Sequence, residues 1–191
     1  MPRVLVAYAS RHGGTRGIAE RIGEVLRTEG LEAVVASTDA THDVGMADAF
    51  VIGSGVYMGS WLKEATDFIA LHEGLFATRP VWLFSSGPLL GSQGKDAAGL
   101  LADALGPTDG PGSGGRKKIA ELSGLIHPRD HRAFLGAYDP KDPPKVMVER
   151  IVRMMPAAKK SMPAGDFRDW DAVEAWAREI AAALRAPVGA R

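Results

Sequence analysis

Residues 3–15, RVLVAYASRHGGT, decide the fold class of this chain. The first six are an apolar run typical of a buried strand, and an amphipathic helix follows the loop at residues 10–15 and extends to about residue 29. Free backbone N–H groups and the positive end of the helix dipole converge on such a loop, so it suits an anion such as phosphate. Its hydroxyls can donate hydrogen bonds, and its glycines allow a ligand to approach the backbone. The stretch predicts an α/β fold that begins with a phosphate-binding loop.

The composition limits the chemistry that this chain can use. It has 191 residues, a net charge of zero and no cysteine. The length predicts a single domain over residues 1–187. Without cysteine there is no disulfide, thiolate nucleophile or cysteine-held metal cluster, and the neutral charge gives no reason to expect nucleic-acid binding. We expect a cytoplasmic protein, because no apolar run approaches the ~20 residues of a membrane span and no signal peptide is evident. His127 and His131 are expected in a surface loop and not at a metal site.

Strand-like and helix-like segments alternate along the chain, which is typical of a parallel sheet with helices on both faces. The predicted strands are 3–8, 32–36, 49–53, 80–85 and 133–138, and the predicted later helices are 61–75, 95–105, 145–155 and 170–184. Asp169 or Asp171 is the expected N-cap of the last helix. Residues 106–130 are rich in glycine and proline and then basic, so we predict a long insertion there that either covers a substrate or decorates the surface.

Three loops follow strands one, three and four, at residues 10–15, 54–61 and 86–91. In an open doubly wound sheet, ligands bind outside the carboxyl ends of the strands. The second and third loops mix glycines with an aromatic residue, a methionine and leucines. Such loops can offer apolar walls and backbone hydrogen bonds to a flat ligand.

This arrangement resembles the flavodoxin family, whose first loop carries a hydroxyl-x-x-Gly-x-Thr pattern around the phosphate of FMN. More narrowly, the chain is similar to the flavodoxin-type, quinone-dependent protoporphyrinogen IX dehydrogenases. That similarity lies in the first strand, loop and helix, in residues 134–138, and in the Asp169-Trp170 entry to the last helix. It covers most of the chain apart from residues 106–130. The resemblance implies a flavodoxin-like, three-layer, doubly wound fold with a five-stranded parallel sheet in the order 2-1-3-4-5.

The resemblance also implies where FMN binds. Residues 10–15 would hold the phosphate, residues 57–59 and 86–89 would border the two sides of the isoalloxazine ring, and Gly59 or Gly55 would lie near N5. Arg11, His12 and Arg16 either assist the phosphate dianion or are solvated side chains beside the loop. No catalytic side chain and no metal ligand is expected, because the flavin would carry the electrons. The predicted cofactor-binding residues are Ser10, Arg11, His12, Gly13, Gly14, Thr15, Ser54, Gly55, Val56, Tyr57, Met58, Gly59, Ser86, Gly87, Pro88 and Leu89.

Two functions of different classes stay open at this point. One is an FMN-dependent oxidoreductase that passes electrons between a small-molecule substrate and a quinone-type acceptor. The other is a flavodoxin-type electron carrier that docks to redox partner proteins. Carrier flavodoxins are typically strongly acidic, so the zero net charge favours the enzyme. A module of the same fold without flavin is a third alternative, which nothing in the three loops favours.

Departures from the dehydrogenase pattern concern the substrate more than the flavin. Tyr57-Met58-Gly59 stands where those enzymes tend to carry Arg-Tyr-Gly, and residues 86–89 also differ.

A nicotinamide-binding domain is disfavoured because the first loop lacks Gly-x-Gly-x-x-Gly. The predicted helix 145–155 is basic and amphipathic, so it either contacts the inner face of a membrane peripherally or packs on the sheet.

Overall fold

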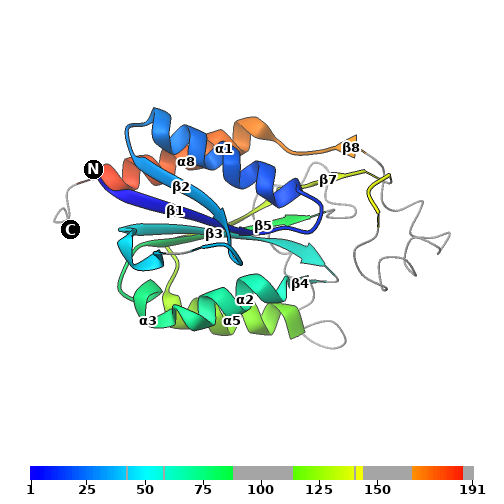
Figure 1. The fold of residues 1–191 in the computed structure, drawn as a ribbon, viewed down its shortest axis with the longest axis horizontal. Coiled ribbons are helices and arrows are strands. Elements are labelled where there is room, and N and C mark those ends of the chain that lie inside the picture. The colour runs from blue at the N-terminus through cyan, green and yellow to red at the C-terminus, as the bar shows by residue number, and fades with distance from the viewer. Residues whose placement is uncertain (42, 58, 88–113, 140, 144–164, 187–191) are drawn as a thin grey trace.

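A computed structural model of the chain describes residues 1–41, 43–57, 59–87, 114–139, 141–143 and 165–186 (Figure 1). Its centre is a parallel sheet in the order β2-β1-β3-β5-β6. The strands are β1 (Arg3–Ala9), β2 (Glu32–Ser37), β3 (Ala49–Tyr57), β5 (Val81–Gly87) and β6 (Asp130–Leu135). Since β5 and β6 are the fourth and fifth strands of the prediction, the predicted order 2-1-3-4-5 is confirmed. A two-residue strand, β4 (Ser60–Trp61), pairs antiparallel with β3, and the short 3-10 helix η1 (Val44–Met46) precedes β3.

Helices cover both faces of this sheet. Figure 1 shows α1 (Gly14–Thr28) and α8 (Trp170–Arg185) on one face, with α2 (Lys63–Leu71), α3 (Glu73–Phe76) and α5 (Gly114–Ile126) on the other. The side chains of β1 alternate between the two cores, with Val4 and Val6 toward α1 and α8, and Leu5 and Ala7 toward the opposite helices. Because both faces are covered, the central strands β1, β3 and β5 are mostly apolar and buried. The predicted three-layer, doubly wound α/β fold is therefore confirmed.

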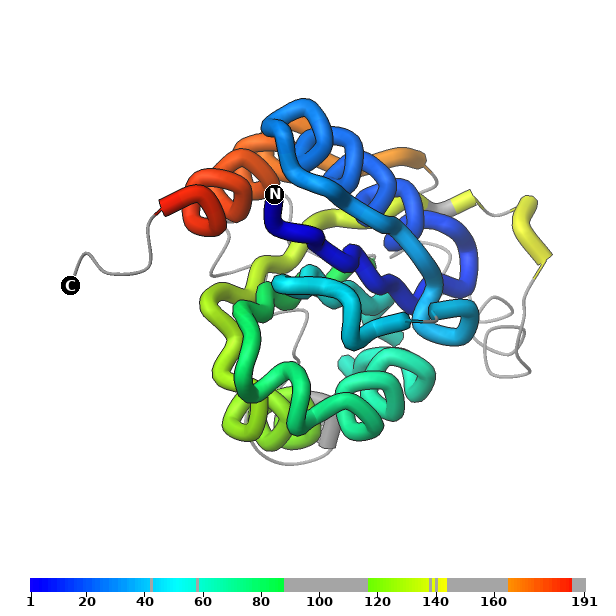
Figure 2. The backbone as a smooth tube through the Cα atoms, turned by 60° about the vertical axis from the view of Figure 1, so that its left-hand side comes forward, coloured from blue at the N-terminus to red at the C-terminus, as the bar shows by residue number. Residues whose placement is uncertain are grey.

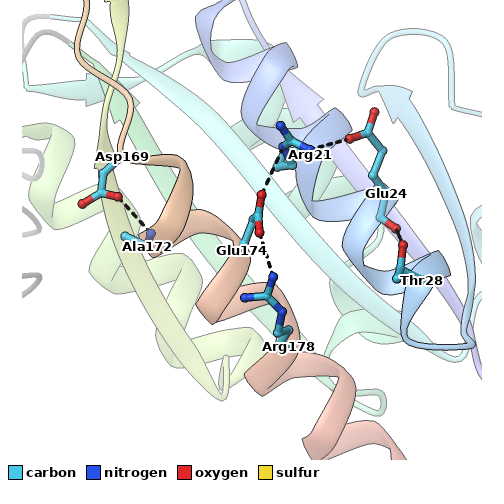
Figure 3. Close-up of polar contacts among 7 residues, drawn as sticks. All are labelled: Arg21, Glu24, Thr28, Asp169, Ala172, Glu174 and Arg178. Carbon is cyan, nitrogen blue, oxygen red and sulfur yellow. Dashed lines mark hydrogen bonds and ion pairs between the residues drawn. The ribbon is translucent and has the colours of Figure 1, made fainter.

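The helices α1 and α8 lie side by side, and both were predicted from their apolar stripes. An ion pair between Arg21 Nε and Glu174 Oε1, 3.7 Å long, joins them on the surface (Figure 3). Asp169 is the N-cap of α8, because its Oδ1 accepts a 3.0 Å hydrogen bond from the backbone N–H of Ala172 (Figure 3). Of the two predicted N-caps, Asp169 is the one that the structure shows.

The predicted insertion at residues 106–130 is wrong in its second half. Residues 114–126 form α5, which buries Ile119, Leu122 and Ile126 against the sheet. These side chains are spaced by three and four residues, so they share one helical face and contribute to the core. The glycine-rich part before residue 114 lies outside the described residues.

Two other predicted elements differ in their bounds. Trp61 does not open a helix but belongs to β4, and the predicted helix 61–75 is divided into α2 and α3 at His72. The last parallel strand begins at Asp130 and ends at Leu135. Residues 137–138 instead form β7 (Ala137–Tyr138), which pairs antiparallel with β8 (Gly165–Asp166).

The carboxyl ends of the parallel strands meet at one end of the sheet. Figure 2 shows the start of β1 beside the last turn of α8, while the turn from β1 into α1 lies at the opposite end, near residues 137–139. The predicted helices 95–105 and 145–155 lie outside the described residues. Within the described part of the chain, no helix is long and apolar enough to cross a membrane.

Candidate functional site

The turn between β1 and α1 presents backbone N–H groups at the carboxyl edge of the sheet. Gly13 has a φ of 80°, in the left-handed region that favours glycine, and its N–H donates a 3.1 Å hydrogen bond to Ser10 Oγ. The backbone N–H of Gly17 donates to the Gly13 carbonyl at 3.0 Å, which begins the helical hydrogen-bond pattern. The N–H groups of residues 14–16 therefore have no acceptor within the helix, and Gly13 has no side chain to supply one. This terminus is suited to an anion.

The end of β3 lies against this turn. A Cβ built on Gly55 would be 3.0 Å from Tyr57 Cε2 and 3.3 Å from Thr15 Oγ1, so the tyrosine ring and the threonine hydroxyl both lie over Gly55. Arg11 Cζ lies 4.8 Å from the centroid of the Tyr57 ring, and the ring of His12 lies 6.4 Å from it. The structure thus brings the first predicted loop together with Gly55 and Tyr57 of the second.

Four residues of the predicted second loop, at positions 54–57, belong to the strand β3 instead. Ser54 is fully buried, and its Oγ accepts a 3.0 Å hydrogen bond from the Leu62 N–H and donates a 2.9 Å one to the Gly55 carbonyl. Val56 is buried and pairs with Trp61 of β4. Ser54 and Gly55 pair with β5, and Val56 and Tyr57 pair with β4, so β3 extends beyond the end that its sequence pattern predicts. The Ser54 hydroxyl therefore links β3 to Leu62, the residue that precedes α2.

The predicted third loop also begins later than expected. Ser86 and Gly87 are the last residues of β5, are buried, and pair with Phe134 and Leu135 of β6. A Cβ on Gly136 would lie 3.3 Å from the Gly87 backbone, so the two segments approach closely there. Met58, Pro88 and Leu89 lie outside the described residues. The role of the second and third loops beside a flavin ring stays a prediction.

The charged side chains near the turn contact neighbouring carboxylates or the Tyr57 ring. Arg16 Nε donates to Glu20 Oε1 at 2.7 Å, and this hydrogen bond raises the pKa of Arg16. His12 Nδ1 lies 3.9 Å from Asp142 Oδ2. Arg11, which stacks on the Tyr57 ring, is the cation most directly associated with the wall of the site. Among the residues that the structure describes, no cluster of three or more potential ligands could hold a metal ion.

A buried polar chain lies on the opposite face of the sheet. Trp61 Nε1 donates a 2.8 Å hydrogen bond to Ser85 Oγ, which lies 3.0 Å from His131 Nε2. The prediction of a surface loop for His131 is wrong, because Asp130–Leu135 pairs with β5 as an edge strand. Burial lowers the pKa of His131 to about 4, and the nearby charge of Asp130 opposes this shift. His131 is therefore neutral at pH 7.

One contact to the turn had no counterpart in the predicted site. A Cβ built on Gly14 would be 3.5 Å from the backbone N of Ala137, so β7 lies against the first residue of α1. Residues 134–138 were predicted as part of the last strand and carry part of the family resemblance, but they were not among the predicted site residues. A glycine at the first position of a helix is the local signal for such a close approach.

A family model described as Flavodoxin domain matches residues 5–142. The chain belongs to the flavodoxin family. The predicted likeness to flavodoxins is thereby confirmed, and the narrower likeness to protoporphyrinogen dehydrogenases is left as a proposal.

Solved structures of flavodoxins align with almost all of the chain. A mutant of flavodoxin from Pseudomonas aeruginosa has a TM-score of 0.54 and 18% identity, with 96% of this chain and 99% of that one covered. The Streptococcus pneumoniae TIGR4 flavodoxin has a TM-score of 0.56 and 15% identity over 95% and 99%. Rubredoxin oxygen:oxidoreductase from Desulfovibrio gigas has a TM-score of 0.57 and 18% identity, and the alignment covers 98% of this chain but 37% of that one. At these identities the likeness shows the shared fold.

The family implies a flavin cofactor, and the described residues fit its phosphate end. The first turn of α1 offers N–H groups, Ser10 lies in the turn, and the Thr15 hydroxyl lies over Gly55. Tyr57 adds a flat aromatic surface next to these donors. Donors for an anion and a wall for a ring thus meet at the carboxyl edge of the sheet, where doubly wound folds bind their ligands.

Proposed function

We propose that this protein binds FMN and acts as a flavodoxin-like oxidoreductase. The observation that carries the proposal is the set of N–H groups at residues 14–16, which have no acceptor within α1 and lie beside Tyr57. Phosphate binding at a helix terminus uses these groups and the helix dipole together. Riboflavin has the same ring system without the phosphate, so it distinguishes this site from a general apolar cleft.

Each residue near the turn has a defined part in this proposal. The N–H groups of residues 14–16 and the Thr15 hydroxyl hold the phosphate oxygens, and Arg11 supplies positive charge nearby. Tyr57 packs against one side of the ring, and the absence of a side chain on Gly55 allows Tyr57 and Thr15 to approach its backbone closely. When bound, the flavin supplies the electron-carrying chemistry, while the protein binds and orients it.

We favour an enzyme resembling the protoporphyrinogen dehydrogenases, with a small-molecule substrate and a quinone-type acceptor. Its support is the neutral net charge of the chain together with the Asp169-Trp170 entry to α8. An electron carrier is the alternative, and the alignment over 99% of two flavodoxins supports it. Membrane contact through residues 145–155 remains part of the proposal, although this segment lies outside the described residues.

Substitution of Thr15 by Ala tests the phosphate site. The loss of one hydrogen bond to a charged group is expected to weaken FMN binding about tenfold and to leave riboflavin binding unchanged. Thr28→Ala is the matched control, because Thr28 lies at the other end of α1 and its hydroxyl bonds to the Glu24 carbonyl (Figure 3). Equal FMN affinity in the Thr15→Ala and Thr28→Ala proteins would argue against phosphate binding at this turn.

Anaerobic mixing of the FMN-loaded protein with a porphyrinogen and a soluble quinone separates the enzyme from the carrier. Formation of porphyrin together with quinol, at a rate proportional to protein concentration, supports the enzyme. Electron exchange with a redox protein and no turnover of the small molecules supports the carrier.

A further inference from the structure

Two short segments far along the chain lie against the first turn of α1. The backbone of Ala137 in β7 lies next to Gly14, and β7 pairs with β8. The backbone N–H of Phe167 donates a 3.2 Å hydrogen bond to the Gly136 carbonyl. These hydrogen bonds join residues 136–138 to residues 165–167, which lead into α8. Residues 136–138 lie next to the turn where the phosphate would bind.

Arg168 lies between β8 and α8 in the chain and contacts Asp166, Trp170 and Gly17. Its Nε and Nη2 donate to the two oxygens of Asp166 at 2.7 and 2.5 Å, and its Cζ lies 4.4 Å from the centroid of the Trp170 ring. Only 17% of the side chain is exposed. A planar guanidinium held by a carboxylate fork and an aromatic face has little freedom to move.

The remaining guanidinium nitrogen of Arg168 lies directly on α1. A Cβ built on Gly17 would overlap Nη1, and it would also contact the Trp170 ring at 3.9 Å. Gly17 is the residue whose N–H makes the first hydrogen bond of α1, to Gly13. Glycine in a helix is unfavourable by about 1 kcal/mol relative to alanine, and here its lack of a side chain makes room for the guanidinium.

We propose that Arg168 is a positioning residue for the phosphate site, which rests on the proposed function. Its guanidinium is fixed by Asp166 and Trp170 and packs on Gly17, so it holds the first turn of α1 in the conformation that presents the N–H groups of residues 14–16. Arg168 has this role through shape and not through its charge, because the Asp166 carboxylate neutralises it.

Asp166→Asn distinguishes a positioning role of Arg168 from an electrostatic one, because the two roles predict opposite changes in FMN affinity. If the charge of Arg168 attracted the phosphate, removal of the neighbouring carboxylate would tighten FMN binding. If the fork positions the guanidinium, the same substitution loosens Arg168 and weakens FMN binding. We expect the weaker binding.

The experiment compares FMN and riboflavin affinities of the full chain by quenching of flavin fluorescence. Arg168→Gln and Asp166→Asn are expected to weaken FMN binding about tenfold, because a displaced first turn of α1 would lose about one N–H hydrogen bond to the phosphate, and to change riboflavin binding less than about twofold. Arg178→Gln is the matched control and is expected to bind FMN as the wild type does, because Arg178 is exposed on α8 and pairs with Glu174 (Figure 3).

Gly17→Ala tests the same contact with both charged side chains in place. It is expected to weaken FMN binding in the wild type and to have no further effect in the Arg168→Gln background, which is the non-additivity of two residues in contact. The flavin-free proteins can also be titrated with inorganic phosphate and followed through the amide NMR signals of Gly14 and Thr15. We expect the variants to have the same order of phosphate affinity as of FMN affinity.

Four results would overturn the proposal. They are equal FMN affinity in the Arg168→Gln and Arg178→Gln proteins, tighter FMN binding by Asp166→Asn, equal losses for FMN and riboflavin, and additive effects of Gly17→Ala and Arg168→Gln. A wild-type protein with no preference for FMN over riboflavin would instead refute the proposed function, and the positioning role with it.

Discussion

Neutral His131 makes the stability of this protein depend on pH in a definite way. The ring packs against Ser85 and Trp61 and is partly buried, and this burial lowers its pKa to about 4 from the ordinary value of 6.5. In the unfolded chain the ring takes up a proton near pH 6.5, whereas the folded protein resists protonation down to about pH 4. The unfolded state therefore binds more protons between these values, and the free energy of unfolding falls as the pH is lowered through this window.

The size of the effect follows from the difference between the two pKa values. Each pKa unit corresponds to 1.36 kcal/mol, so a difference of about 2.5 units lowers the free energy of unfolding by about 3 kcal/mol between pH 6.5 and pH 4. The contribution is complete above pH 6.5 and is lost progressively below it. For a domain stabilised by roughly 5–15 kcal/mol, this is a large fraction.

Urea unfolding of the wild type and of His131→Gln, followed by tryptophan fluorescence between pH 7 and pH 4, measures this contribution. Glutamine keeps a polar group near Ser85 and does not titrate in this range, so the variant should lose about 3 kcal/mol less than the wild type over the interval. Other groups titrate in both proteins and cancel in the difference. If the two curves remain parallel down to pH 4, His131 is not held neutral by burial and the reasoning is wrong.

Two further predictions concern the core and the helix cap. Gly53→Ala should lower the free energy of unfolding by about 1–3 kcal/mol, because the new Cβ would overlap the buried ring of Phe84, while Gly45→Ala, where space is open, should change it little in the same denaturant experiment. Asp169→Ala should cost about 1 kcal/mol through loss of the α8 N-cap, and Asp169→Asn, which can still accept the hydrogen bond, should recover most of that loss in thermal unfolding.

The fold was predictable because its main signals are local. The apolar run of β1, the loop after it and the stripe of α1 are contiguous, and the stripe of α8 is equally regular. Parallel strands covered on both faces give continuous apolar runs, which the pattern of the first four strands displays. The order of the strands came from the family resemblance and not from these local signals.

The missed features depend on contacts between distant segments. Glycine and lysine at residues 114–118 concealed α5, although the spacing of Ile119, Leu122 and Ile126 carried a helical signal. The extension of β3 beyond residue 53 depends on its pairing with β5 at Ser54 and with β4 at Val56. The contact of Arg168 with Gly17 joins segments about 150 residues apart, and only the folded arrangement brings them together.

The proposed function requires that the turn at residues 10–15 binds the phosphate of FMN. Titration of the purified, flavin-free protein with FMN and with riboflavin tests it most directly, because the two ligands differ only in that phosphate. We expect much tighter binding of FMN, with the preference for FMN weakened by competing inorganic phosphate. Equal affinities for the two flavins, or no binding of either, would contradict it.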